Sequence, residues 1–218
     1  RVNISVAIIP MQEQFGWSDS QVGFIFSSFY LGYMLTMALG GYLSDKFGGK
    51  RVLGWGVVLW SIFTILTPFA AHNGFFALFF IRILMGVGEG VTFPAWHSLY
   101  ARWIPFDERT RAIAFTNSGI SVGTIIGYIG TQIIIISMGW EWAFYIFGVV
   151  GLVWFIFWHK NITSYPADHK KITSDELTYI KENAPSSNPA KKIPLRQLLT
   201  NKPFLAIVSA TFANNWSL

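Results

Sequence analysis

An arginine and a glutamate lie inside one of the most apolar stretches of the sequence. Arg82 and Glu89 are seven residues apart, and the stretch Phe75–Ser98 holds no other Lys, Arg, Asp or Glu. In a helix this spacing is about two turns, so both side chains share a face, about 10 Å apart along the axis. A guanidinium is a planar fork of donors that suits carboxylate or phosphate, and a desolvated glutamate can carry a proton. The pair therefore indicates anion binding and proton coupling.

Each of these side chains also has a structural explanation. Arg82 could extend to the non-cytoplasmic surface, and Glu89 could be a structural hydrogen-bond donor. Because ionisable groups are costly inside lipid, we keep Arg82 as a candidate ligand and Glu89 as a candidate ion-coupling residue. Gly86 and Gly90, near the same stripe, would let either a backbone or a substrate come close, and Pro94 permits a bend.

The elements that must position these residues are apolar helices. Hydrophobic residues make up 52% of the chain and charged residues 12%, against about 25% charged in an ordinary soluble domain, and the mean hydropathy is +0.43. A span of about 20 apolar residues marks a transmembrane helix. We therefore expect an all-α, multi-pass integral membrane protein with spans at Val2–Gln14, Gln21–Leu43, Val52–Ala71, Phe75–Ser98, Ala112–Ser137 and Trp142–Trp158, and the start of a seventh at Phe204–Leu218.

The basic residues indicate how these helices are oriented. Fourteen of the sixteen lysines and arginines fall in the loops that follow the second, fourth and sixth spans, and none falls in the opposite loops. By the positive-inside rule the basic loops are cytoplasmic. The net charge of +5 is then a topology signal, so no nucleic-acid partner is expected.

Composition divides the chain into three expected parts. Residues 1–158 would form a six-helix transmembrane bundle, 159–202 a cytoplasmic central loop, and 203–218 the truncated start of helix seven. The chain opens at Arg1 without a methionine, and we interpret it as a fragment. Within the central loop, Ser174 is the expected N-cap of one short surface helix.

The loop between the second and third spans carries a motif. It reads Gly41-Tyr42-Leu43-Ser44-Asp45-Lys46-Phe47-Gly48-Gly49-Lys50-Arg51, in which two glycines allow a tight turn and two basic residues anchor it. It resembles the signature Gly-x-x-x-Asp-Arg/Lys-x-Gly-Arg-Arg/Lys of the major facilitator superfamily, with Gly49 where a basic residue is usual. The resemblance implies a conformational latch, the alternative being a plain topological turn. The candidate gating residues are Gly41, Asp45, Lys46, Gly48, Lys50 and Arg51.

The fourth span carries a second motif, which resembles one family within that superfamily. Arg-x-x-x-Gly-x-x-Glu-Gly-x-x-x-Pro, from Arg82 to Pro94, is similar to helix four of the anion:cation symporter family. That family includes sialin, vesicular glutamate transporters, kidney-type sodium–phosphate cotransporters and plant organellar phosphate transporters. The segment that begins at Arg1 is similar to the family's helix one. The resemblance implies that Arg1 and Arg82 hold the anion and that Glu89 takes part in proton coupling.

Three further features bear on the site. Phe26 stands where the vesicular glutamate carriers have a histidine, which argues against their substrate. Tyr30 and Tyr33 are candidate substrate-binding residues, with packing as the alternative. In the fifth span, four glycines at three- and four-residue spacing predict a helix-packing seam: Gly119, Gly123, Gly127 and Gly130.

These observations lead to one functional expectation. The protein would be a secondary active transporter that works by alternating access between two bundles, and this one would be built from two three-helix repeats. The first choice of substrate is inorganic phosphate, coupled to H⁺ or Na⁺. The alternatives are an organic anion, such as sialic acid, glutamate or another carboxylate, or a non-transporting anion sensor.

A transporter of this kind also implies particular partners and a location in a membrane. The expected partners are a small anion, membrane lipid and the C-terminal half of the same protein. We expect no enzyme, no metal site and no cofactor other than the co-transported ion, and the sequence contains no cysteine. The membrane is left open between the plasma membrane, a lysosome or vesicle, and a plastid.

Overall fold

A computed structural model describes residues 2–184, 200–203, 205–206 and 209, the side chain of Ala38 excepted. The chain forms two compact units, Arg1–Pro185 and Ser186–Leu218. Arg1 and most of the expected seventh helix lie outside the described residues. The described part contains helices and no strand, which confirms the all-α class. The division into bundle, central loop and helix seven stays a prediction.

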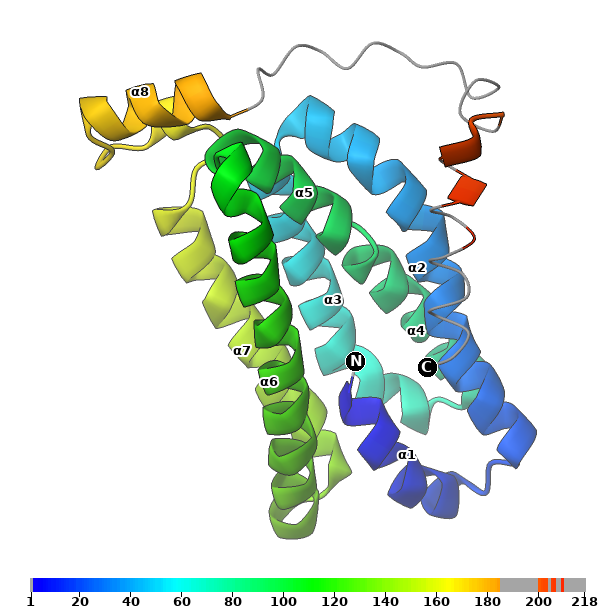
Figure 1. Ribbon diagram of the computed structural model, residues 1–218. Helices are drawn as coiled ribbons and strands as arrows, with labels where there is room; N and C mark the ends of the chain where they lie inside the picture. Colours follow the sequence, from blue (N-terminus) through cyan, green and yellow to red (C-terminus); the bar gives the residue numbers. More distant parts are fainter. Residues whose placement is uncertain (1, 185–199, 204, 207–208, 210–218) are drawn as a thin grey trace. The chain divides into compact units, whose positions relative to one another are not determined.

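The helices of the first unit follow the expected spans (Figure 1). Two of the helices, α4 and α5, together occupy the fourth expected span. Four stretches of the described chain, including α4–α5 taken together, are long and apolar enough to cross a membrane, and α2 is a fifth if its two segments, bent by 48°, count as one span. The helices are α1 (Val2–Phe15), α2 (Asp19–Phe47), α3 (Gly49–His72), α4 (Phe75–Glu89), α5 (Thr92–Trp103), α6 (Phe106–Met138) and α7 (Trp140–Asn161).

The fourth span is broken between α4 and α5. The ring of Pro94, the third residue of α5, cannot donate a hydrogen bond and would clash with the carbonyl of the residue four positions earlier. That residue is Gly90, where α4 ends. The interruption of the helix therefore lies four residues before the proline, directly after Glu89.

Glycines bring the backbone of α4 against the two helices beside it. A Cβ added to Gly86 would lie 2.9 Å from the backbone nitrogen of Tyr33 on α2. One added to Gly88 would lie 2.9 Å from the backbone nitrogen of Trp60 on α3. Backbone, and not substrate, therefore occupies the space beside Gly86, and α4 is held between α2 and α3.

The end of the bundle opposite the basic loops is closed by aromatic packing. The Trp140 indole donates to Gln14 Oε1 at 2.7 Å and stacks on His72, with ring centroids 5.8 Å apart. Phe15 packs against both of these rings. Below this layer the buried core consists of Ile4, Ala7, Ile8, Met11, Trp17, Ile25, Ala71, Leu78, Trp140 and Phe144.

A buried polar contact joins α1 to α6 and α7. Asn3 donates to the Ala143 carbonyl at 3.4 Å, and Thr131 donates to Asn3 Oδ1 at 3.2 Å. Asn3 and Thr131 are both buried. The two hydrogen bonds fix the first turn of α1, which follows directly on Arg1.

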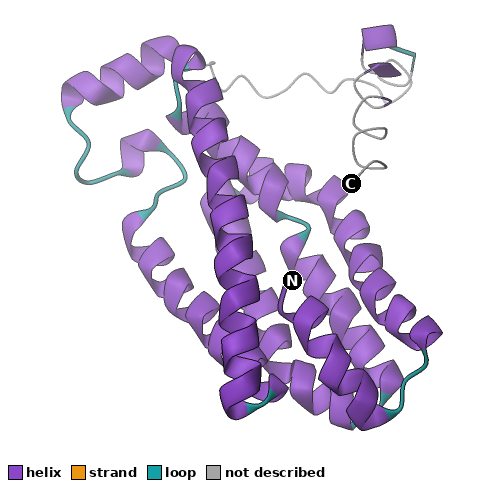
Figure 2. Cartoon of the chain, turned by 60° about the horizontal axis from the view of Figure 1, so that its bottom comes forward, coloured by secondary structure: helices purple, strands orange, loops and turns teal. Residues whose placement is uncertain are grey.

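Much of α6 is exposed along its length, as Figure 2 shows from a second direction. A Cβ added to Gly119 or Gly123 would meet nothing within 4 Å. The predicted packing seam is therefore wrong for these two glycines within the described part of the chain. Gly127 and Gly130 do approach other helices, with Val2 at 3.7 Å and Phe147 at 3.4 Å from an added Cβ.

The central loop begins with ordered structure. Its helix α8 (Ser174–Asn183) follows the short 3₁₀ helix η1 (Pro166–Asp168). The N-cap of α8 is Thr173, whose side chain accepts from the Glu176 backbone N–H, and not the neighbouring Ser174 as expected. The Tyr179 hydroxyl donates to Glu108 Oε1 at 3.3 Å, so α8 is bonded to the first turn of α6.

Candidate functional site

Arg82 lies inside the bundle, with a side chain that is only 2% exposed. Its Nε donates to the Ile25 carbonyl at 3.5 Å, and its Nη1 lies 3.3 Å from the sulfur of Met85. The guanidinium carbon is 5.0 Å from the centre of the Phe29 ring, a cation–π distance. These contacts hold the side chain between α2 and α4, away from the membrane surface.

One wall of a cavity of about 250 Å³ is formed by Arg82. Tyr30, a predicted substrate-binding residue, lines the same cavity, whereas Tyr33 does not. The Tyr33 ring packs 5.8 Å from that of Phe29. The lining includes an arginine and several hydroxyl groups among apolar side chains: Val2, Ile4, Ser5, Phe26, Phe29, Tyr30, Arg82, Thr124 and Tyr128.

Glu89 lines a second cavity, of about 480 Å³. Glu89 is the last residue of α4, so it lies where the fourth span is broken. Hydroxyl and indole groups of α3 and α5 share this cavity with it: Trp60, Ser61, Thr64, Thr92 and Trp96. Gly119 and Gly123 line it from α6, so the open face of α6 borders the glutamate.

The two cavities adjoin, because Val2 and Thr124 line both. The predicted anion ligand and the predicted coupling residue therefore face neighbouring spaces on one side of α4. Their placement agrees with the shared face that the seven-residue spacing predicts. The roles of Arg82, Tyr30, Tyr33 and Glu89 stay predictions, and Arg1 lies outside the described residues.

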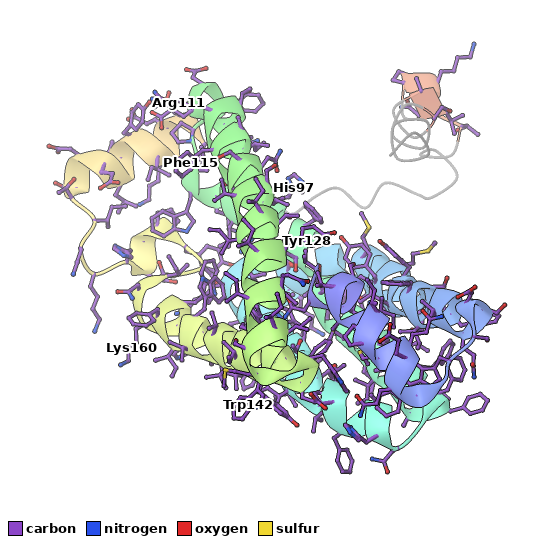
Figure 3. The ribbon with its side chains drawn as sticks, turned by 90° about the horizontal axis from the view of Figure 1, so that it is seen from below. His97, Arg111, Phe115, Tyr128, Trp142 and Lys160 are labelled. Carbon is purple, nitrogen blue, oxygen red and sulfur yellow. The ribbon has the colours of Figure 1, made fainter. Side chains whose placement is uncertain are left out.

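Several lining residues were not singled out from the sequence as candidates. Ser5, Thr124 and Tyr128 add hydroxyl groups to the cavity of Arg82, and Figure 3 shows Tyr128 on the middle part of α6. Thr124 and Tyr128 are four residues apart, so they share one face of α6. That spacing was visible in the sequence, but polar residues at helical spacing occur on many helices. Phe26, which stands in place of a histidine, also lines this cavity.

The candidate gating motif forms the turn between α2 and α3. Gly48 has φ +85°, which favours glycine, and caps both helices. A Cβ at Gly49 would lie 2.6 Å from the Ala95 carbonyl on α5, so the start of α3 packs directly on the fourth span. Around these buried glycines, Asp45, Lys46 and Arg51 are exposed, while Gly41 and Lys50 are half-buried.

The last turn of α7 and the segment that follows it hold this turn in place. Lys50 Nζ donates to the His159 carbonyl at 2.9 Å, and the Trp158 indole donates to the Lys50 carbonyl at 3.0 Å. The Arg102 guanidinium lies 4.6 Å from the Tyr165 ring centroid. The motif turn, the end of α5 and the start of the central loop therefore form one layer at the end of the bundle that carries the basic loops.

The family follows from comparison with known proteins. Residues 1–218 match the family model described as Major Facilitator Superfamily. The chain belongs to the Major Facilitator Superfamily. The motif turn at Gly48 is thus the turn in which this superfamily carries its signature, and the multi-pass membrane topology expected from the sequence is confirmed.

Curated relatives narrow the position within the superfamily. The chain is 43% identical over 216 residues to "Sodium-dependent phosphate transport protein 1, chloroplastic" of Arabidopsis thaliana, covering 99% of this chain and 42% of that protein. It is 42% identical over 216 residues to "Ascorbate transporter, chloroplastic" of the same plant, covering 99% and 40%. Sialin of Ovis aries is 37% identical over 206 residues, covering 94% and 42%. These relatives confirm the resemblance to anion transporters, and the chain spans about two fifths of their length.

A solved structure supports the fold. A bacterial homologue of the human lysosomal transporter Spinster, in an inward-facing and occupied conformation, superposes with a TM-score of 0.63 at 22% identity. The match covers 78% of this chain and 42% of that one. At this identity the likeness concerns the fold alone.

Proposed function

We propose that the protein to which this chain belongs is a secondary active transporter that moves an anion across a membrane by alternating access, with inorganic phosphate as the first choice of substrate. The observation that carries the proposal is the buried guanidinium of Arg82 in a cavity wall. A buried cation without functional purpose is costly in a membrane protein. Relatives named for phosphate and ascorbate transport support an anionic substrate.

The chemistry around Arg82 suits a small oxyanion. An arginine fork binds two oxygens at once, and the hydroxyls of Ser5, Tyr30 and Tyr128 supply further hydrogen-bond partners in the same cavity. Arg1 would add a second guanidinium from the start of α1. The rest of the site would come from the C-terminal half of the protein, as alternating access between two bundles requires.

Glu89 is proposed to couple transport to a cation, either H⁺ or Na⁺. Its cavity adjoins that of Arg82 through Val2 and Thr124, so the charge at Glu89 and the anion at Arg82 would influence one another across a short distance. A positive co-substrate would let the loaded site reorient through the membrane. Glu89 is the last residue of α4, directly before the interruption between α4 and α5.

Uptake by proteoliposomes of the full-length protein tests the substrate and the arginine together. Labelled phosphate should accumulate only when a proton or sodium gradient is imposed. Arg82→Lys keeps the charge but loses the fork, so uptake should fall by at least tenfold, while Arg111→Lys on the exposed part of α6 should transport normally. Wild-type-like uptake by folded Arg82→Lys protein would exclude the ligand role.

A panel of competitors separates the alternatives. If ascorbate, sialic acid or glutamate blocks uptake and is itself accumulated while phosphate is not, the substrate is an organic anion. Binding without accumulation under either gradient would indicate a sensor and refute transport.

The coupling role needs a different readout. Glu89→Gln should retain exchange of labelled for unlabelled anion but lose accumulation driven by the ion gradient, because exchange requires no net cation movement. Gradient-driven accumulation at the wild-type level in Glu89→Gln would refute the role.

A further inference from the structure

A third cavity, separate from those of Arg82 and Glu89, lies on the other side of α4. It is a cavity of about 490 Å³ between α2, α3 and α4, which we name the outer groove. It is lined by α2 at Thr36, Leu43 and Phe47, by α3 from Arg51 to Leu59, and by α4 at Val87 and Gly88. In a helix of 3.6 residues per turn, Val87 points about 140° away from Arg82. The outer groove is therefore separate from the proposed anion site.

The walls of the outer groove are almost entirely apolar. The Thr36 hydroxyl donates to the carbonyls of Gly32, at 3.1 Å, and Tyr33, at 3.4 Å. Its hydrogen is therefore already bonded within α2, and it needs no polar ligand. Trp55, which is 66% exposed, borders the groove, and such a tryptophan is typical of the interface between membrane and water. These walls offer a polar solute almost no hydrogen-bonding groups.

One charged side chain lines the outer groove. It is Arg51, which lies at the cytoplasmic end of α3. From Arg51 to Leu59 the groove follows α3 for about 12 Å, which is within the depth of one leaflet of a hydrocarbon core about 30 Å thick. Lys46 lies beside the same end, with its ammonium 5.2 Å from the ring centroid of Phe47. The groove is thus apolar in depth and positive at its mouth.

We propose that the outer groove binds an anionic phospholipid of the cytoplasmic leaflet, with an acyl chain along the apolar walls and the headgroup phosphate at Arg51. Apolar contact alone gives little preference, because lipid tails are as apolar as the groove. The phosphate of any phospholipid can accept a charge-assisted hydrogen bond from the exposed guanidinium. The positive charge at the mouth favours an anionic lipid, because its headgroup carries no cation that offsets the phosphate. This inference goes beyond the proposed function and holds for any transported substrate.

Native mass spectrometry of the full-length protein with phosphatidylglycerol and phosphatidylcholine tests whether the groove prefers an anionic headgroup. One basic residue near the surface corresponds to about a fivefold preference for the anionic lipid. Arg51→Gln should lower this preference severalfold and Arg51→Lys should keep most of it, while Arg111→Gln, outside the groove, should leave it unchanged. Equal binding of both lipids by the wild type, or an undiminished preference in folded Arg51→Gln protein, would overturn the proposal.

A second pair of variants tests the acyl chain. Val87→Trp fills the groove and should lower phosphatidylglycerol occupancy severalfold, whereas Leu84→Trp places the same bulk on an exposed part of α4 outside it. Equal occupancy in the two variants would show that the lipid binds elsewhere.

Photocrosslinking identifies the occupant directly. With benzoylphenylalanine in place of Trp55, the proposal predicts crosslinks to phosphatidylglycerol. Crosslinks to the C-terminal half of the protein instead would show that the groove is a contact between the two bundles, and the lipid site would be wrong.

Discussion

The fourth and fifth spans of this bundle use glycine for opposite purposes. In α4, Gly86 and Gly88 face backbone atoms of α2 and α3 at distances that no larger residue allows. In α6, Gly119 and Gly123 face open space and border the cavity of Glu89. One helix is fixed on two sides by its neighbours, while the other leaves its glycine face open within the described part of the chain.

The difference in packing indicates that α4 and α6 have different structural roles. A helix that carries a buried charge must hold it in one place, and close backbone packing of α4 does so for Arg82. A helix that borders the site can leave its face open for a substrate or for the other bundle, as α6 does. Four predictions test this comparison, from the largest expected effect to the smallest.

The same substitution at one glycine of each helix should give the largest contrast. Gly86→Ala forces a methyl group onto the backbone of α2 and should lower the free energy of unfolding by about 3 kcal/mol. Gly123→Ala should change it by less than about 1 kcal/mol, because the methyl meets nothing and alanine favours a helix. Thermal unfolding of the full-length protein in detergent measures both. An equal loss in the two variants would show that α6 is packed as tightly as α4.

The buried contact between α1 and α6 should give the next largest effect. Asn3→Ala removes the acceptor of Thr131 and the donor to Ala143, and should cost about 1–2 kcal/mol. A double-mutant cycle with Thr131→Val should return a coupling of about 0.6 kcal/mol, the usual size in membrane proteins. Additive losses would mean that the described hydrogen bond contributes nothing.

At the layer formed by the motif turn and the end of α7, the expected effect is smaller. Trp158→Phe removes the hydrogen bond from the indole to the Lys50 carbonyl and shortens the ring that stacks on Trp154. The loss of the hydrogen bond should cost about 1 kcal/mol. Trp142→Phe, at the far end of α7 (Figure 3), is the control for the change of ring. If both variants unfold at the same temperature, the motif turn does not depend on this bond.

The smallest effect concerns the bond between α8 and α6. The negative charge of Glu108 raises the pKa of the Tyr179 phenol above its ordinary value of 10.0. A raised pKa means that the docked state favours the neutral phenol, so docking is strongest below pH 10 and weakens as the pH rises above it. Hydrogen exchange of α8 between pH 8 and 11 should show this loss in the wild type and not in Tyr179→Phe. Identical profiles would contradict the bond.

Most of the fold could be predicted from the sequence, because transmembrane spans follow from hydropathy. Their orientation, which rests on the loop charges, stays a prediction. The break after Glu89 was less visible, since a proline fixes the place of a bend only through the carbonyl four residues earlier. Both α4 and α6 carry several glycines, and their spacing alone could not say which of them would meet another helix. Only tertiary packing separates the two.

The site was predicted in part for the same reason. Arg82 and Glu89 stand out because charge is rare in these helices, and the structure places them on neighbouring cavities. Ser5, Thr124 and Tyr128 carry no such signal, because hydroxyl groups are common in transmembrane helices and bond to their own backbone, as Thr124 does to Ile120 at 2.8 Å.

The length of α6 has a mechanical consequence. Its 33 residues correspond to about 50 Å of helix, whereas the hydrocarbon core is about 30 Å thick. About 20 Å of the helix therefore extends beyond the hydrocarbon. The N-terminal end of α6 carries the Glu108 contact with α8. A tilt of α6 within the membrane produces a larger displacement at this end of the helix. A spectroscopic label on α8 would therefore report motions that begin beside Glu89.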